Sequence, residues 1–172
     1  MEYIRYIWPG FIEGEHHRVI AERLTAVAKG ELKRLIINMP PRHTKSEFAS
    51  IYFPSWMMGL QPNLKIMQTT HTADLSINFG RKVRNLMDTE EYTKIFQDVN
   101  LAADSKSAGK WQTSKGGEYF AAGVGGAIAG RGADLLIIDD PHSEQDAMSM
   151  NLLDSCYEWY TSGPRQRLQP GG

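Results

Sequence analysis

The chain has 172 residues, of which 41% are hydrophobic and 23% are charged, values typical of one globular domain or of part of a larger one. Its formal net charge of −1 provides no overall attraction to nucleic acid, so a DNA partner would have to be held by a local patch or inside an oligomer. No apolar run approaches the roughly 18 residues of a membrane span, the N-terminus lacks the layout of a secretory signal, and the one cysteine, Cys156, excludes an internal disulfide.

The first third of the chain predicts a helix, a strand, a loop and a second helix. Apolar residues at helical spacing predict a helix over Glu15–Ala28 that Gly30 closes. Residues 35–38 form a short apolar run and predict a buried strand. The loop of residues 40–46 then opens a helix that Pro54 should kink or divide, because proline has no N–H donor.

The middle of the chain continues this alternation. Residues 64–70 predict a second strand, and a helix begins near Thr72 with apolar residues four, four and three apart. Residues 98–115 are polar and irregular in pattern. Residues 118–122 predict a short strand.

The last third predicts one strand and one helix. Leu135–Ile138 follows the glycine-rich residues 123–132 and is the third strongly apolar strand. Residues 144–160 predict a helix that Ser143 caps and Gly163 ends. Alternating strands and helices favour an α/β fold with a mainly parallel sheet and helices on both faces.

Lys45 and Ser46 form the most informative pair in the sequence. They follow the predicted strand 35–38 by a short loop and open a helix, which is the context of a nucleotide-binding P-loop. There the backbone N–H groups face the phosphates, the lysine reaches the β- and γ-phosphates, and the serine hydroxyl ligates Mg²⁺. Met39 and Thr44 stand at the two glycine positions of the pattern, so Thr44 must shape the loop without glycine's freedom at positive φ. Taken alone, the pair fits a solvated Lys-Ser at a helix start equally well.

Two aspartates directly follow the apolar run Leu135–Ile138. A carboxylate at the carboxyl end of a parallel strand lies at the sheet edge where α/β proteins bind ligands. Asp139 is therefore expected to hold Mg²⁺ through its water shell, and Asp140 to orient or deprotonate an attacking water. A turn before Pro141 would also explain an isolated pair of aspartates. Joined to Lys45 in this order and spacing, the pair predicts nucleotide binding.

These motifs resemble those of the large terminase subunits of tailed phages. Residues 38–47, Asn-Met-Pro-Pro-Arg-His-Thr-Lys-Ser-Glu, are similar to the family's deviant Walker A segment. Residues 125–141 are similar to its glycine-rich approach to Walker B and to Walker B itself, and residues 79–84 and 159–172 are also similar. The resemblance implies that residues 1–172 form the N-terminal P-loop NTPase domain, of ASCE type, of such a subunit. It further implies a sheet that is incomplete at the C-terminus, with the nuclease domain and its activity absent.

The resemblance also implies the activity and the partners. The expected function is ATP hydrolysis, with ATP and Mg²⁺ as cofactors, that drives double-stranded DNA through the portal protein into the procapsid. The expected partners are the portal protein, the small terminase subunit and further copies in a ring of five subunits. The expected location is the host cytoplasm during phage assembly, neither in a membrane nor secreted.

The expected site residues follow from the matched motifs. The residues expected to contact ATP are His17, Pro41, Arg42, His43, Thr44, Lys45, Ser46 and Glu47. The residues expected to hold the metal are Ser46 and Asp139. The residues expected to act in catalysis are Asp140, Glu144, Arg42 and Arg131. Glu144 is the alternative acid because many family members have glutamate where Asp140 stands. Arg131 is either a finger toward a neighbouring subunit or a surface charge.

Two other functions and two groups of basic residues stay open at this point. The chain could be a nucleotide-binding assembly module that does not hydrolyse ATP, or a helicase-like ATPase with the same core. The candidate DNA contacts are Arg81, Lys82 and Arg84 on a predicted helix, and Lys106, Lys110 and Lys115 in a polar stretch. Solvated surface charges are the alternative explanation for both groups.

Overall fold

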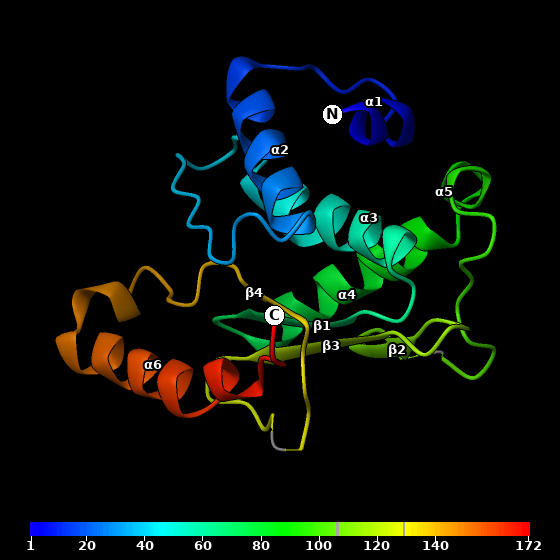
Figure 1. Ribbon diagram of the computed structural model, residues 1–172. Helices are drawn as coiled ribbons and strands as arrows, with labels where there is room; N and C mark the ends of the chain where they lie inside the picture. The colour runs from blue at the N-terminus through cyan, green and yellow to red at the C-terminus, as the bar shows by residue number, and fades with distance from the viewer. Residues whose placement is uncertain (106, 129) are drawn as a thin grey trace.

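A four-stranded mixed sheet with helices on both faces forms the centre of the computed structural model, which describes residues 1–105, 107–128 and 130–172 (Figure 1). The basic Lys106 and Ala129 of the glycine-rich segment lie outside the described residues. The strands are β1 (Lys65–Thr70), β2 (Lys110–Gln112), β3 (Glu118–Gly123) and β4 (Leu135–Ile138). The α-helices are α1 (Glu2–Ile7), α2 (Glu15–Ala28), α3 (Phe53–Leu60), α4 (Ala73–Met87), α5 (Glu90–Ile95) and α6 (Met150–Ser162). Shorter helical segments are the π-helical η1 (Glu47–Tyr52) and the 3-10 turns η2 (Asp146–Met148) and η3 (Pro164–Arg167).

The strands lie in the order β2-β3-β1-β4. β1 pairs in parallel with both β3 and β4, so that Ile66 lies opposite Tyr119 on one side and Leu135 on the other. β2 is antiparallel to β3. The carboxyl ends of β1, β3 and β4 therefore meet at one edge of the sheet, and the predicted α/β class with a mainly parallel sheet is confirmed.

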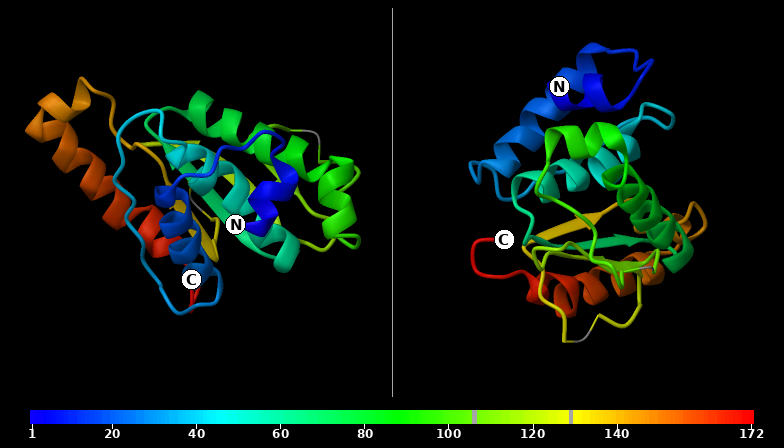
Figure 2. Two further views of the ribbon diagram at one scale, coloured as in Figure 1. Left: turned by 90° about the horizontal axis from the view of Figure 1, so that it is seen from above. Right: turned by 90° about the vertical axis from the view of Figure 1, so that its right-hand side faces the viewer.

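Alternate residues of the strands face two separate apolar clusters. Ile66 and Tyr119 point into the larger one, which η1, α2, α3 and α4 complete. Met67 and Ala122 point into the smaller one, together with Ile128 from the glycine-rich segment. Figure 2 shows α6 on the opposite side of the sheet from α3 and α4. Burial on both faces agrees with the continuous apolar sequence of β4 and with the unbroken burial of residues 66–70 in β1, although Gln68, Thr69 and Thr70 are polar.

Most of the predicted elements are confirmed. The helix predicted over residues 15–28 is α2, and the strands predicted at 64–70, 118–122 and 135–138 are β1, β3 and β4. The hydroxyl of Thr72 caps α4 by accepting from the N–H of Leu75. Pro54 stands where η1 gives way to α3, which agrees with the predicted division of that helix.

The strand predicted at residues 35–38 is wrong. The segment is extended, with Ile37 partly buried against the larger cluster and Ile36 84% exposed, but it pairs with no strand in the described part of the chain. A strand is defined by the neighbour that accepts and donates its backbone hydrogen bonds. Residues 35–37 are apolar as the prediction required, but within the described residues they lack the neighbouring strand whose backbone would pair with theirs.

The last helix begins later than predicted, at Met150. Ser143 instead closes a short turn: its hydroxyl accepts from the N–H of Asp146 at 3.1 Å, and its own N–H donates to the Asp146 carboxylate at 2.9 Å. The extended backbone of Ser149 separates this turn from α6. The stop at Gly163 is confirmed.

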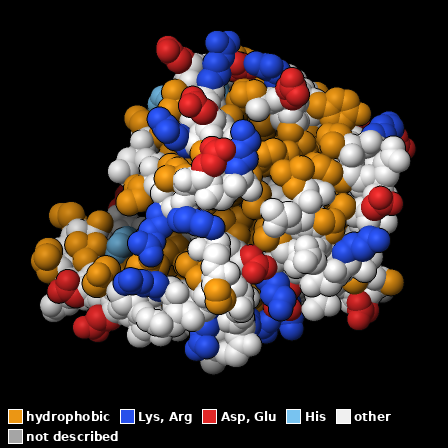
Figure 3. Space-filling view, viewed as in Figure 1, with side chains coloured by type: hydrophobic (Ala, Val, Ile, Leu, Met, Phe, Trp, Pro, Cys, Tyr) orange, Lys and Arg blue, Asp and Glu red, His pale blue; other side chains and the backbone are white. Residues whose placement is uncertain are grey.

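The surface is mixed in character. On the face drawn in Figure 3, Lys and Arg side chains lie among acidic and apolar ones instead of in one stripe. Apolar side chains gather near the start of α6, where Met148 and Met150 are 89% and 71% exposed. No helix in the described part of the chain combines the length and the apolarity that crossing a bilayer would need.

Candidate functional site

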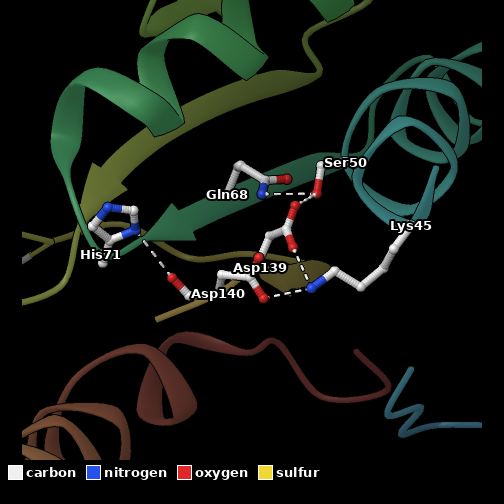
Figure 4. A network of polar contacts seen from close by, with 6 residues as sticks. All are labelled: Lys45, Ser50, Gln68, His71, Asp139 and Asp140. Carbon is white, nitrogen blue, oxygen red and sulfur yellow. Dashed lines mark hydrogen bonds and ion pairs between the residues drawn. The ribbon is translucent and has the colours of Figure 1, made fainter. Parts of the chain in front are cut away.

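The structure brings Lys45, Asp139 and Asp140 together at the carboxyl edge of the parallel strands (Figure 4). Lys45 lies at the start of the helical segment that follows the loop, and the aspartates directly follow β4. Lys45 Nζ lies 3.4 Å from Asp139 Oδ1 and donates a hydrogen bond to Asp140 Oδ1. Two motifs 95 residues apart thus meet in one site.

The Asp139 carboxylate is buried and held from two sides. It is 6% exposed, and its Oδ2 accepts a hydrogen bond of 2.9 Å from Ser50 Oγ on η1. Gln68 Nε2, from the middle of β1, donates to the same serine oxygen at 3.3 Å (Figure 4). The N–H of Asp139 donates to the carbonyl of Thr69 at 2.9 Å. Side chain and backbone of Asp139 are therefore both fixed, with Oδ1 directed at Lys45.

The two carboxylates keep Lys45 charged. Burial works to lower the pKa of its ammonium, but the hydrogen bond with Asp140 and the negative charge of Asp139 outweigh that effect, so the pKa is raised above its ordinary value. Lys45 is 22% exposed, and Asp140 is 65% exposed on the solvent side of the ammonium. Lys45 is thus a positively charged group, paired with two carboxylates, at a solvent-accessible end of the strands.

The loop before Lys45 has the backbone of an anion-binding loop. Arg42 and Thr44 have φ values of 63° and 59°, while His43 between them and Lys45 after them lie outside the left-handed region. Such alternation turns successive N–H groups toward a common concave side. Within the described part of the chain, the N–H groups of His43, Thr44 and Lys45 donate to no acceptor. These free donors at a helix start favour a negatively charged ligand.

His17 reaches this loop from α2. It is 5% exposed, and its Nε2 lies 2.7 Å from Thr44 Oγ1. Its ring lies against Phe48 with centroids 5.0 Å apart and nearly parallel planes, and edge-on to Phe11. Sequence reasoning expected His17 to contact ATP, whereas the structure buries its ring and places it behind the loop.

Asp140 is fixed by its backbone, and its exposed carboxylate accepts the hydrogen bond from Lys45. It has a φ of 43°, and its carbonyl accepts hydrogen bonds from the N–H of His71 at 3.2 Å and from His71 Nδ1 at 3.3 Å. His71 follows the carboxyl end of β1 (Figure 4). The arrangement presents an exposed carboxylate beside the Lys45 ammonium.

Arg131 lies at the other end of the parallel strands, beside the first residue of β3. Its guanidinium donates to Glu118 Oε1 at 2.9 Å and stacks 4.0 Å from the centre of the Phe120 ring. Glu118 is the first residue of β3, whereas Lys45 and Asp139 lie beyond the carboxyl ends of the strands. The structure does not bring Arg131 to the same site.

The other predicted site residues surround the loop or lie on the surface. Pro41, Arg42 and His43 are exposed, and His43 Nδ1 donates to the carbonyl of Pro41 at 2.9 Å. Ser46 and Glu47 are half-buried beside Lys45. Glu144 is exposed in the turn between β4 and α6.

Sequence reasoning missed Ser50, Gln68 and His71. Ser50 lies four residues after Ser46, about one helical turn farther along, so helical spacing could have pointed to it. Gln68 lies in the middle of a predicted buried strand, and buried polar side chains need partners. Its Oε1 is buried without a hydrogen bond among the described residues. His71 directly follows a strand whose carboxyl end lies at the expected ligand edge.

The oxygen atoms at this edge suit Mg²⁺ better than a tightly chelated metal. Within the described residues, no group of three or more His, Cys, Asp or Glu side chains could hold a metal ion. Mg²⁺ usually binds one or two carboxylates, keeps several waters, and takes its remaining ligands from phosphates. The Asp139 carboxylate, which already pairs with the Lys45 cation, fits that pattern, whereas no contact among the described residues joins the Ser46 hydroxyl to Asp139.

No protein-family model and no curated protein sequence matches this chain.

Proposed function

We propose that this chain binds ATP with Mg²⁺ at the Lys45 edge of the sheet and hydrolyses it. The observation that carries this proposal is the meeting of the Lys45 ammonium with Asp139 and Asp140 beside a loop of free N–H groups. A triphosphate needs fixed positive charge and backbone donors, and a hydrolase also needs a carboxylate that can reach water. The edge offers all three.

Each residue then has a role set by its position. The Lys45 ammonium leaves the carboxylates and pairs with the terminal phosphates, while the N–H groups of residues 43–45 bind phosphate oxygens. Asp139 and Ser46 would hold Mg²⁺, which supplies charge neutralisation. Asp140, exposed and free to accept a proton, orients and deprotonates water. Arg131 has no place in this scheme within one subunit.

The finer fold assignment belongs to the same proposal. The order of loop, helix, parallel strand and strand-end aspartates supports a P-loop NTPase of ASCE type. The unpaired extended segment of residues 35–38 departs from it, because a P-loop normally follows a strand of the sheet. β4 pairs with β1 on one side, and in the described part of the chain no strand pairs with its other side. Residues 35–38 lie toward that unpaired side (Figure 1).

The biological role we propose is that of a DNA-packaging motor, the ATPase part of a phage large terminase subunit. The support is the resemblance of residues 38–47 and 125–141 to that family's two nucleotide-binding segments. In this role ATP turnover drives double-stranded DNA into a procapsid, with the portal protein, the small terminase subunit and a ring of further copies as partners. The exposed Arg81 and Lys82 on α4 are candidate DNA contacts.

The test is nucleotide binding and turnover in matched variants. We expect the protein to bind a fluorescent ATP analogue with Mg²⁺, and Lys45→Ala to lose that binding, whereas Lys94→Ala, which changes an exposed lysine of α5, binds normally. Asp140→Asn should bind but not hydrolyse ATP, and the exposed Asp154→Asn on α6 should do both. Binding that is indifferent to Lys45 would refute the proposal.

Two further outcomes separate the alternatives. Lys45-dependent binding without any turnover would favour a nucleotide-binding assembly module. Turnover that single strands stimulate, without translocation of duplex DNA in the presence of procapsids, would favour a helicase-like ATPase.

A further inference from the structure

His17 makes two hydrogen bonds that fix its protonation. The N–H of Gly14 donates to His17 Nδ1 at 2.8 Å, so that nitrogen carries no proton. The proton therefore lies on Nε2, which donates to Thr44 Oγ1 at 2.7 Å. Burial, reinforced by the neighbouring His16, lowers the pKa of His17 and keeps the ring neutral.

Thr44 adopts a backbone conformation that its own side chain disfavours. Its φ of 59° lies in the left-handed region, which β-branched residues rarely occupy and glycine enters freely. Its hydroxyl accepts from His17 and donates to the carbonyl of His43 at 2.7 Å. Its carbonyl accepts the first helical hydrogen bond, from the N–H of Phe48 at 3.1 Å. Among the described residues, the hydrogen bond from His17 to this hydroxyl is therefore the one side-chain link that holds the strained residue from outside the loop.

The His17 ring packs against two phenylalanine rings that also contact each other, with the Phe11 and Phe48 centroids 5.7 Å apart, so it holds Thr44 from a packed position. Phe48 stacks on one face and Phe11 contacts the ring edge-on. Because Phe48 belongs to η1 and Phe11 to the segment before α2, the ring cannot shift without moving both. A fixed donor opposite a strained acceptor selects the left-handed state of Thr44 over the states it would otherwise populate.

We propose that His17 is a positioning residue that holds Thr44, and with it the loop of residues 41–46, in the conformation that receives the phosphates of a nucleoside triphosphate. This inference rests on the proposed function for its ligand, and it gives His17 the role of holding the loop instead of contacting ATP. Such loops have glycine at the position of Thr44. Here the neutral His17 on α2 provides the support that a threonine needs at this position and a glycine does not. It also makes phosphate binding depend on the docking of the N-terminal segment.

The first experiment needs no nucleotide. Ring ¹⁵N–¹H spectra of protein labelled at histidine should show His17 neutral, with the proton on Nε2 and exchanging slowly. In Thr44→Val, which keeps the branched shape and lacks the hydroxyl, that proton should exchange much faster. A proton on Nδ1, or a ring that is charged near neutral pH, would overturn the proposal.

The second experiment measures the affinity for a non-hydrolysable ATP analogue with Mg²⁺. His17→Leu keeps an apolar side chain against Phe11 and Phe48 without a donor and should weaken binding about tenfold, the equivalent of one lost hydrogen bond. Thr44→Val should weaken it similarly. His17→Gln, whose amide can accept from Gly14 and donate to Thr44, should recover most of the loss.

The decisive comparison repeats the histidine change in a glycine background. With Gly at position 44 the loop needs no external support, so His17→Leu combined with Thr44→Gly should bind within about twofold of Thr44→Gly alone. An equal, tenfold effect of His17→Leu in both backgrounds would refute a positioning role. Absence of Lys45-dependent binding by the unaltered protein would refute the proposed function, while the ring spectra would still decide whether His17 holds Thr44.

Discussion

Ser50→Ala tests the network behind Asp139, because it removes one hydroxyl that serves two buried groups. The Asp139 carboxylate loses a hydrogen bond of 2.9 Å, and Gln68 Nε2 loses its acceptor at 3.3 Å. A hydrogen bond to a charged group contributes about 1.5–3 kcal/mol, and a buried donor left without a partner costs about 1–3 kcal/mol. Gln68 is fully buried and its Oε1 already has no partner among the described residues, so its whole amide becomes unsatisfied.

The expected loss in the free energy of unfolding is about 2–4 kcal/mol, allowing for partial relaxation of the site. For a chain of this length such a loss lowers the melting temperature by roughly 4–16 °C. Urea unfolding followed by circular dichroism measures it directly. The matched control is Ser155→Ala on α6, since Ser155 is exposed and its hydroxyl donates to the carbonyl of Asn151 on the same helix.

A double-mutant cycle isolates the shared hydroxyl. In a Gln68→Leu background no buried amide remains to be orphaned, so Ser50→Ala should cost about 1 kcal/mol less than it does beside Gln68. A loss below about 0.5 kcal/mol for Ser50→Ala itself, equal to that of the Ser155 control, would refute the assignment of this network.

Three further predictions concern stability elsewhere in the chain. Burial lowers the pKa of His17 in the folded chain below its ordinary value of 6.5, so at lower pH the unfolded chain takes up a proton that the folded chain does not. The urea midpoint of unfolding should therefore stay constant above pH 6.5 and decrease below it. A midpoint that does not change with pH would contradict this. Arg131→Ala should cost about 1 kcal/mol, since it removes one ion pair and one cation–π contact, and an unchanged urea midpoint would argue against both contacts. Gly80→Ala should cost about 1–3 kcal/mol although alanine favours helices, because its Cβ would lie 2.6 Å from the Ala108 carbonyl and 2.9 Å from the Tyr119 ring; a neutral or stabilising effect on melting would disprove that clash.

Elements whose pattern is complete within the element could be predicted from the sequence. Helix α2 carries its apolar stripe and its glycine stop within a few residues, and the hydroxyl of Thr72 caps α4 from the adjacent position. Strand β4 is apolar throughout, and residues 66–70 of β1 are all buried, because both faces of the sheet are covered. Local periodicity and capping decide such segments, since their interactions span few residues.

Elements that depend on a distant partner could not be predicted in this way. Residues 35–38 have the composition of a strand, but no strand in the described chain pairs with them. The edge strand β2, of three residues, exists through its pairing with β3. The short helices α1 and α5 are too brief for a periodic signal, and each contacts the other in the folded chain.

The candidate site divides in the same way. The sequence by itself determined that Lys45 opens a helix and that Asp139 and Asp140 end an apolar strand, because residue type and order suffice for both. Only the tertiary structure decided that His17 supports Thr44, that Ser50 and Gln68 hold Asp139, and that Arg131 lies at the other end of the parallel strands. These contacts join residues 13 to 89 positions apart. A local sequence pattern does not indicate which side chains so far apart in the chain come into contact. The packing of the sheet and its helices decides that.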